Sequence, residues 1–321
     1  MKRSLTPLFA AVSMAVAAIA APAQAEKINV FSGVSPVFGP PFVADVKGYF
    51  KDAGLDVTVR TFQAGAAATE AFRGGGAQYL VTCDQPMLIM AATGAAKIVA
   101  QFSQTEHMVY MLGHKSVKSA ADLKGKKVGV FRKSASEFML EQYLKSGGLK
   151  TSDIEMVHLA PFDQIPAVVK GDVDAISLWK PYDLKVLALS KNHKILADTG
   201  DMGYKLYCGM LISNKYLESG DKAEINKFMG AVKKGADYLA NNQMGGVKVL
   251  AKFTKLPENE VDHVTKGEGW SMVIDDAFMK QMRAIEQFML DLKMIDKGID
   301  WKNAVDWSLL KNLDPNLVKV M

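Results

Sequence analysis

Short apolar stretches alternate along the chain with longer stretches in which apolar residues recur every three or four positions. The first kind is typical of β-strands and the second of helices. The pattern predicts strands at 27–31, 55–62, 79–82 and 97–102. Between them it predicts helices at 40–50, 65–74 and 86–92. Strands that alternate with helices favour parallel sheets with helices on both faces.

The same rhythm restarts near residue 123 and then changes. Further strands are predicted at 128–131, 154–158, 174–178 and 194–197. Ser134 and Glu137 have the spacing of a capping box, which marks the start of a helix. Other helices are predicted at 163–170, 225–239, 246–253 and 276–292, so the chain becomes almost wholly helical after residue 223.

Two successive β/α runs followed by a helical region predict an α/β protein with two lobes, each a mostly parallel sheet flanked by helices. We expect lobe 1 to comprise residues 26–112 and 213–321, and lobe 2 to comprise residues 113–212. The chain has no low-complexity linker between the two runs. The lobes should therefore be joined by extended crossover segments near 108–114 and 205–213.

The first 25 residues have the pattern of a secretory signal peptide. Lys2 and Arg3 precede an apolar stretch at 8–21, and Ala-Gln-Ala at 23–25 fits a cleavage site. No later apolar run approaches the roughly 18 residues that a membrane span needs. We therefore expect a soluble mature protein in the periplasm of a Gram-negative cell.

The composition, with 49% hydrophobic and 23% charged residues, is that of an ordinary globular protein. The net charge is only +5 and acidic residues are spread throughout, so we expect no nucleic-acid or anionic-membrane partner. The two cysteines, Cys83 and Cys208, could pair in an oxidising compartment, but they are far apart in the sequence.

The motifs of common enzymes and metal sites are absent from the sequence. The five histidines show no H-E-x-x-H spacing, and there is no G-x-S-x-G, Walker or G-x-G-x-x-G motif. We therefore expect neither catalysis nor a cofactor or metal. An exported enzyme that uses Cys83 as its nucleophile remains an alternative.

Four segments carry a resemblance to a known group of proteins: VADVKGYFKDAGLDV at 43–57, FQAGAAATEAFRGG at 62–75, DLKGKKVGV at 122–130 and GDVDAISLWKPY at 171–182. In this order and spacing, behind a signal peptide, they resemble the periplasmic solute-binding proteins of ABC importers for nitrate, taurine, alkanesulfonates and thiamine-pyrimidine precursors. The taurine-type binders look most similar.

The resemblance implies the two-lobed type II periplasmic-binding fold, with a ligand captured between hinged lobes and passed to an ABC permease in the inner membrane. The ligand would be a small organosulfonate, carboxylate, zwitterion or nitrogen heterocycle, and the protein a monomer. A sensory protein that presents its ligand to a membrane receptor is a second alternative on this fold.

Ligands of open α/β sheets lie beyond the carboxyl ends of the strands. The small residues in the turn at 63–67 would let a ligand reach backbone N–H groups at a helix start, although they are also ordinary helix-start residues. The candidate ligand-binding residues in such turns are Ser35, Pro36, Gly65, Ala66, Ala67, Cys83, Asp84, Arg132, Ser134 and Ser136.

Three side chains allow more than one interpretation. Trp179, at the end of a predicted strand, faces the ligand by resemblance, or else fills the core of lobe 2. Asp84 would favour an amine if it faces the cleft, or else it caps the following helix. Arg132 could grip an acid group, or remain solvated, or pair with a nearby acid such as Asp84 across the cleft.

Tyr207 and Cys208 lie in the second expected crossover. In taurine-type relatives an acidic residue near this position meets the substrate amine, so Cys208 weakens the taurine assignment. We expect Cys83 and Cys208 to be reduced, because a disulfide between the lobes would restrain opening. The favoured ligand is then a zwitterionic or ring-bearing molecule held between Trp179, Tyr207 and the turns.

Overall fold

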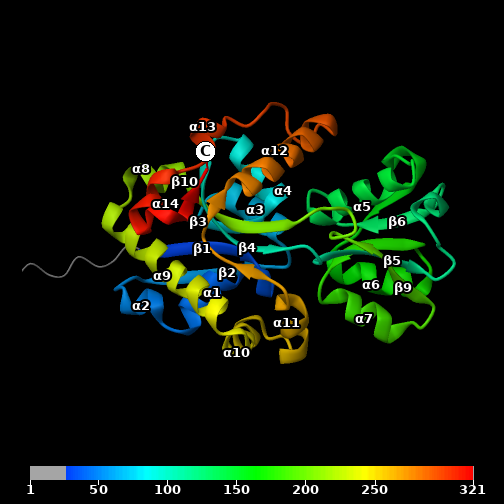
Figure 1. Ribbon diagram of the computed structural model, residues 1–321, viewed down its shortest axis with the longest axis horizontal. Helices are drawn as coiled ribbons and strands as arrows, with labels where there is room; N and C mark the ends of the chain where they lie inside the picture. The colour runs from blue at the N-terminus through cyan, green and yellow to red at the C-terminus, as the bar shows by residue number, and fades with distance from the viewer. Residues whose placement is uncertain (1–26, 321) are drawn as a thin grey trace, which may run out of the picture.

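Two separate β-sheets organise the chain, one at each end of the molecule (Figure 1). The computed structural model describes residues 27–320, so the predicted signal peptide lies outside the described part of the chain. Both sheets are flanked by helices, which confirms the predicted two-lobed α/β class. Among the residues described, no helix is long and apolar enough to cross a membrane.

The first sheet has six strands in the order β11-β4-β10-β3-β1-β2. The sheet is mixed: β1 runs parallel to β2 and β3 on one side, whereas β10 is antiparallel to β3 and β4, and β11 is antiparallel to β4. The inner strands form because their apolar side chains are buried beneath helices on both faces, whereas the edge strand β2 is half-exposed. Their bounds are β1 (Ile28–Gly33), β2 (Val57–Phe62), β3 (Tyr79–Cys83), β4 (Ala96–Thr105), β10 (Leu206–Ser213) and β11 (Gly269–Trp270).

The helices around the first sheet come from both ends of the chain. Those before β5 are η1 (Pro36–Phe38), α1 (Gly39–Val46), α2 (Tyr49–Asp52), α3 (Gly65–Arg73) and α4 (Asp84–Ala92). Those after β10 are α8 (Asn214–Ser219), α9 (Lys222–Asn241), α10 (Gln243–Thr254), α11 (Glu258–Thr265), α12 (Asp276–Asp291), α13 (Trp301–Ala304), α14 (Trp307–Leu313) and η4 (Pro315–Leu317). A short parallel pair, β12 (Ile274–Asp275) and β13 (Val318–Lys319), joins the C-terminal segment to this lobe.

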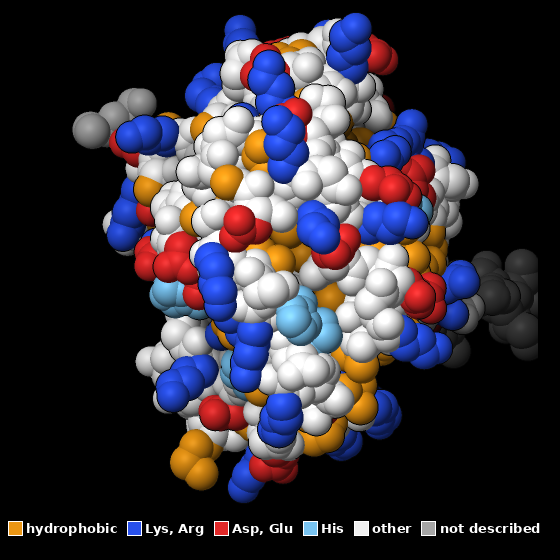
Figure 2. Space-filling view, turned by 90° about the vertical axis from the view of Figure 1, so that its right-hand side faces the viewer, with side chains coloured by type: hydrophobic (Ala, Val, Ile, Leu, Met, Phe, Trp, Pro, Cys, Tyr) orange, Lys and Arg blue, Asp and Glu red, His pale blue; other side chains and the backbone are white. Residues whose placement is uncertain are grey.

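The second sheet has five strands in the order β7-β6-β8-β5-β9. Its bounds are β5 (Val109–His114), β6 (Lys127–Val130), β7 (Glu155–His158), β8 (Ala175–Trp179) and β9 (His193–Asp198). The helices on it are η2 (Ala120–Leu123), α5 (Ala135–Ser146), η3 (Thr151–Asp153), α6 (Pro161–Lys170) and α7 (Tyr182–Leu189). Viewed from this end, the surface carries Lys and Arg side chains interspersed with acidic ones (Figure 2).

The expected crossover segments are strands of the sheets themselves. Residues 109–112 belong to the second sheet through β5, and residues 206–212 to the first through β10. The chain therefore changes sheet between 105 and 109 and again between 198 and 206, a few residues before the predicted boundaries. The physical reason is that β5 and β10 are almost continuously buried, which favours a place inside a sheet.

Most of the other elements lie where the pattern predicts them, within a few residues. The predicted capping box at α5 is altered: Ser134 accepts from the backbone N–H of Ser136, but Glu137 accepts from the N–H of Lys133 instead of that of Ser134. The helices α7, α8, α11, α13 and α14 were not predicted individually, because each has eight residues or fewer and so shows too few turns for a clear helical period.

Candidate ligand-binding cleft

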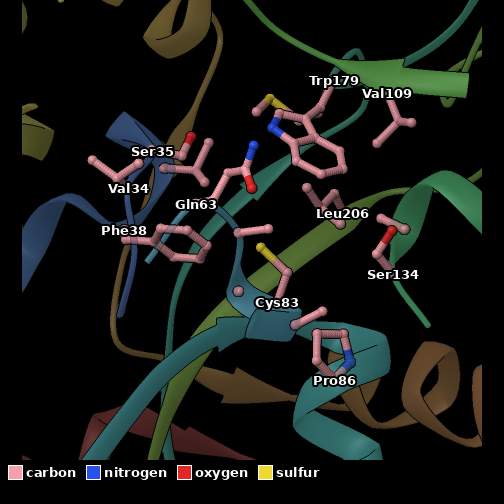
Figure 3. Close-up of a pocket in the computed structure, with 16 residues that line it drawn as sticks. Val34, Ser35, Phe38, Gln63, Cys83, Pro86, Val109, Ser134, Trp179 and Leu206 are labelled. Carbon is pink, nitrogen blue, oxygen red and sulfur yellow. The ribbon is translucent and has the colours of Figure 1, made fainter. Parts of the chain in front are cut away.

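A pocket of about 50 Å³ lies between the two sheets, at the carboxyl ends of β1, β2, β3 and β8. Figure 3 shows the side chains that line it, with Trp179 on one side and Cys83 and Pro86 on the other. The first lobe supplies most of the lining, and the second supplies Val109, Ser134, Ala135 and Trp179. The sixteen lining residues are Val34, Ser35, Val37, Phe38, Gln63, Ala64, Gly65, Ala66, Cys83, Pro86, Met108, Val109, Ser134, Ala135, Trp179 and Leu206.

The pocket is apolar with a few hydrogen-bonding groups. Among the described residues that line it, none has a charged side chain. The polar side chains are Ser35, Gln63 and Ser134, and Ser134 already donates to the carbonyl of Phe131 at 2.6 Å. The hydroxyl oxygen of Ser35 is buried and has no hydrogen-bond partner in the described part of the chain. Ser35 and Gln63 are therefore the side chains available to orient a ligand.

The start of α3 forms one wall of the pocket. Gly65 and Ala66 are the first residues of this helix, so their backbone N–H groups have no partner within it. The hydroxyl of Thr82 lies directly beneath: a Cβ at position 65 would stand 2.5 Å from its Oγ1. Thr82 is fully buried and, among the described residues, its Oγ1 has no hydrogen-bond partner. Glycine at 65 therefore permits a close approach that a larger residue would block.

Trp179 ends β8 and projects toward the pocket from the second lobe (Figure 3). Its ring lies edge-on to Phe131, with 6.3 Å between ring centroids, and edge-on to Tyr182 at 6.2 Å. These two neighbours orient the indole, and the pocket side remains open for a ligand. The cleft interpretation of Trp179 therefore fits its position better than a purely structural one.

Asp84 lies beneath the pocket instead of lining it. It is fully buried at the start of α4, where its Oδ2 accepts from the Tyr204 hydroxyl and its Oδ1 from the Gln85 N–H at 2.8 Å. Burial raises the pKa of Asp84 to about 7, although these hydrogen bonds oppose the shift. Neither predicted role holds, because the carboxyl neither faces the pocket nor caps a helix that starts at Pro86.

Cys83 and Cys208 form a disulfide, so the expectation of reduced thiols was wrong. The two residues face each other in the antiparallel β3–β10 pair, with 3.8 Å between their Cα atoms. The reasoning failed because β10 belongs to the first sheet, so the bond lies within one lobe and does not restrain opening. Cys83 lines the pocket, and the disulfide therefore forms part of its wall.

Several other predicted ligand-binding residues lie outside the pocket. Ser136 is fully buried and donates to the carbonyl of Ser177 at 2.5 Å, and Pro36 is buried in η1. Tyr207 packs edge-on against Phe278, with 5.3 Å between ring centroids, and borders a different depression. In each case a neighbour along the chain lines the pocket instead: Ser35 beside Pro36, Ala135 beside Ser136 and Leu206 beside Tyr207.

Ala67 and Arg132 border a second pocket, here called the outer pocket, which adjoins the first and shares Ala66 and Pro86 with it. Of the predicted set, Ser35, Gly65, Ala66, Cys83, Ser134 and Trp179 line the first pocket itself, here called the inner pocket. Ten lining residues are absent from the predicted set: Val34, Val37, Phe38, Gln63, Ala64, Pro86, Met108, Val109, Ala135 and Leu206. Gln63 and Ala64 belong to the turn at 63–67 that the sequence singles out. The other eight are apolar and look like core residues, and no sequence signal separates the two roles.

No metal site is apparent, since the described residues contain no group of three or more His, Cys, Asp or Glu side chains that could hold an ion. Cys83 and Cys208 are joined in a disulfide, so neither offers a thiolate that could bind a metal ion.

Residues 35–245 match the model of a protein family described as NMT1/THI5 like. The chain belongs to this family. It is 27% identical to the taurine-binding periplasmic protein of Escherichia coli over 254 residues, which cover 76% of this chain and 78% of that one. Membership in the NMT1/THI5-like family confirms the resemblance drawn from the four segments.

Solved structures support the same fold. The alkanesulfonate-binding protein SsuA from Xanthomonas axonopodis pv. citri, bound to MOPS, superposes with a TM-score of 0.75 and 21% identity over 88% of this chain and 99% of that one. The desulfurization enzyme DszB superposes with a TM-score of 0.68 and 15% identity over 89% and 98%. At these identities the likeness shows the fold alone, and the fold carries both binding proteins and an enzyme.

Proposed function

We propose that this protein is the periplasmic substrate-binding component of an ABC importer and holds a small organic molecule between its lobes without transforming it. One observation carries the proposal: the inner pocket takes its lining from both sheets, with Trp179 on one side and Cys83 on the other. A ligand that contacts both lobes stabilises their closed arrangement over the open one.

The relatives support the importer as the setting. The Escherichia coli relative is named a taurine-binding periplasmic protein, and another, in Bacillus subtilis, bears the name of an aliphatic sulfonate-binding protein. A permease in the inner membrane is then the partner that receives the ligand from a monomeric binding protein. The predicted signal peptide at 1–25 would direct the chain to the periplasm.

A binding role fits the pocket better than catalysis does. Nucleophilic catalysis by Cys83 needs a thiolate, and its sulfur is bonded to Cys208. The described residues that line the pocket include no His, Asp, Glu or Lys to transfer a proton. The arrangement can enclose and orient a molecule with Trp179, Ser35 and Gln63.

The test starts with the ligand that the protein itself retains. Protein purified from the periplasm without added compounds would be analysed by native mass spectrometry, and thermal shift would then cover nitrate, taurine, alkanesulfonates and aromatic acids. We expect at least one compound to raise the melting temperature and to reduce the radius of gyration in small-angle scattering. Stabilisation by none of them, together with an unchanged radius, would overturn the proposal.

A matched pair of variants locates the binding site. Trp179→Phe should weaken binding of the identified compound by about tenfold, because the smaller ring loses part of the contact area and the indole N–H donor. Trp307→Phe is the control, since Trp307 begins α14 far from the inner pocket and is not among its lining residues. Equal effects of the two substitutions would place the site elsewhere.

A further inference from the structure

The outer pocket gives the cleft a second compartment with different chemistry. It has a volume of about 370 Å³ and lies between α3 and α4 of the first lobe and the β6–α5 turn of the second. Its lining residues are Ala66, Ala67, Thr69, Glu70, Pro86, Ile89, Phe131, Arg132, Lys133 and His158. Because Ala66 and Pro86 border both pockets, a ligand can extend from one into the other.

Two cationic side chains in the outer pocket form no ion pair. Arg132 and Lys133 are exposed, and neither pairs with any residue that the structure describes. The acid that lines the same pocket, Glu70, pairs with Arg73 outside it at 3.5 Å. The lining of the outer pocket therefore carries an excess of positive charge.

The turn that carries these cations is fixed by hydrogen bonds. The Lys133 N–H donates to Oε2 of the buried Glu137 at 2.7 Å, and Lys133 has a φ of 57°, in the left-handed region. The Arg132 N–H donates to Nδ1 of His158 at 3.3 Å. Since Nδ1 accepts, Nε2 of His158 bears the proton and can itself donate to an acceptor in the pocket. Such a fixed turn reduces the cost of ordering a binding site.

An aromatic wall connects the two pockets. Trp179 of the inner pocket lies edge-on to Phe131, and Phe131 stacks on His158 with 5.4 Å between ring centroids. A flat or apolar part of a ligand can follow this wall from the inner pocket outward.

We propose that the ligand has two ends: an uncharged, apolar end enclosed in the inner pocket and an acid group held in the outer pocket by Arg132 and Lys133. The proposal rests on the binding function put forward above and names its ligand class. The inner pocket has no charged side chain among its described lining residues, so an ionised group there would lose hydration without a full counter-charge. A guanidinium can instead bind a carboxylate or sulfonate through two parallel hydrogen bonds.

The test compares acids with their uncharged amides. Three pairs serve as probes: benzoate and benzamide, phenylacetate and phenylacetamide, and propanesulfonate and propanesulfonamide. Binding to the full mature protein is measured by calorimetry. We expect the acids to bind more tightly than the amides. The Arg132→Gln/Lys133→Gln variant should weaken the acids by about tenfold and leave the amides within about twofold.

Lys170→Gln/Lys191→Gln is the matched control, because it also removes two positive charges from exposed sites of the same lobe, at the end of α6 and between α7 and β9. It should change the affinity of the acids by less than about twofold. Acid affinities that are unaffected by the double variant would overturn the inference and place the acid group at the start of α3. If the amides bind as tightly as the acids, the two-ended ligand is overturned but the binding function stands. If no probe binds, the result counts against the two-ended ligand and against the binding function.

Discussion

Asp84 shows how burial changes the chemistry of a single side chain. The carboxyl is enclosed beneath the inner pocket and accepts from Tyr204 and from the Gln85 backbone. Burial raises its pKa from the ordinary 3.8 to about 7. Between these two values the folded protein binds a proton that the unfolded chain has released, so the contribution of Asp84 to the free energy of unfolding falls as the pH rises from about 4 to 7.

Substitution of Asp84 by Asn should remove this dependence, because the amide is neutral at every pH. Its oxygen can still accept from the Gln85 N–H, and its NH2 group can donate to the Tyr204 hydroxyl oxygen, which reverses that hydrogen bond. Relative to Asp84→Asn, the wild type should lose up to about 4 kcal/mol of unfolding free energy between pH 4 and 8. Urea denaturation across this pH range measures the difference. Asp296→Asn, at an exposed site, is the control and should follow the wild type. Parallel pH profiles of Asp84→Asn and the wild type would contradict the assignment.

The sequence identifies Trp179 as a cleft residue better than it does Asp84 or Tyr207. Trp179 ends a strand, and the strand end alone places it at the cleft edge. The direction of Asp84 depends on Tyr204, a partner 120 positions away in the sequence. Tyr207 alternates with Leu206 along β10, and only the register of that strand decides which of the two faces the pocket.

At the scale of elements, the helical layer of the first lobe depends on close backbone contact between α1 and α9. A Cβ at Gly235 would stand 2.1 Å from the carbonyl oxygen of Pro40. Gly235→Ala should therefore lower the free energy of unfolding by about 1–3 kcal/mol, since the two helices must separate. Gly230→Ala on the same helix is the control: its Cβ would meet only Leu313 at 3.9 Å, and alanine favours the helix by up to about 1 kcal/mol. Equal melting temperatures of the two variants would contradict this packing argument.

The disulfide stabilises the pairing of β3 with β10, which joins two segments 125 positions apart in the sequence. Replacing both Cys83 and Cys208 by Ala should lower the unfolding free energy by about 2–5 kcal/mol, because the unfolded chain gains freedom. Urea denaturation with and without reductant tests this. The unfolding free energy of the double variant should not change with reductant, whereas that of the wild type should fall once the disulfide is reduced. The prediction would be contradicted if the wild type kept its unfolding free energy although thiol titration shows both cysteines reduced.

Local patterns predict the type of element well but not its membership in a sheet. Residues 109–114 and 206–213 are apolar in sequence, yet whether they cross between lobes or pair within one depends on strands far away in the chain. This single uncertainty explains why the two expected crossover segments are strands inside the sheets and why the expectation for the cysteines was wrong. Long-range pairing is set by the total burial of the sheet and leaves no local signal.

At the scale of the whole molecule, α7 of the second lobe meets α11 of the first beside the cleft (Figure 1). Nε2 of His263 donates to Oδ2 of Asp183 at 2.7 Å, and Lys185 pairs with Glu260 at 3.8 Å. Asp183 is only 2% exposed, so the first of these contacts is shielded from water. Both contacts join the lobes directly and can form only while the lobes are close together.

His263→Leu, which has no side-chain donor for Asp183, should therefore shift the ligand-free protein toward an open arrangement. Loss of a shielded hydrogen bond to a carboxylate costs about 1.5 kcal/mol, which corresponds to roughly a tenfold change in the ratio of closed to open molecules. The variant should release its ligand faster and bind it more weakly by a similar factor, and its radius of gyration in small-angle scattering should increase. Lys233→Gln is the control, since it breaks the 2.8 Å pair with Asp237 inside α9. Unchanged affinity and scattering in His263→Leu would show that ligand contacts alone hold the lobes closed.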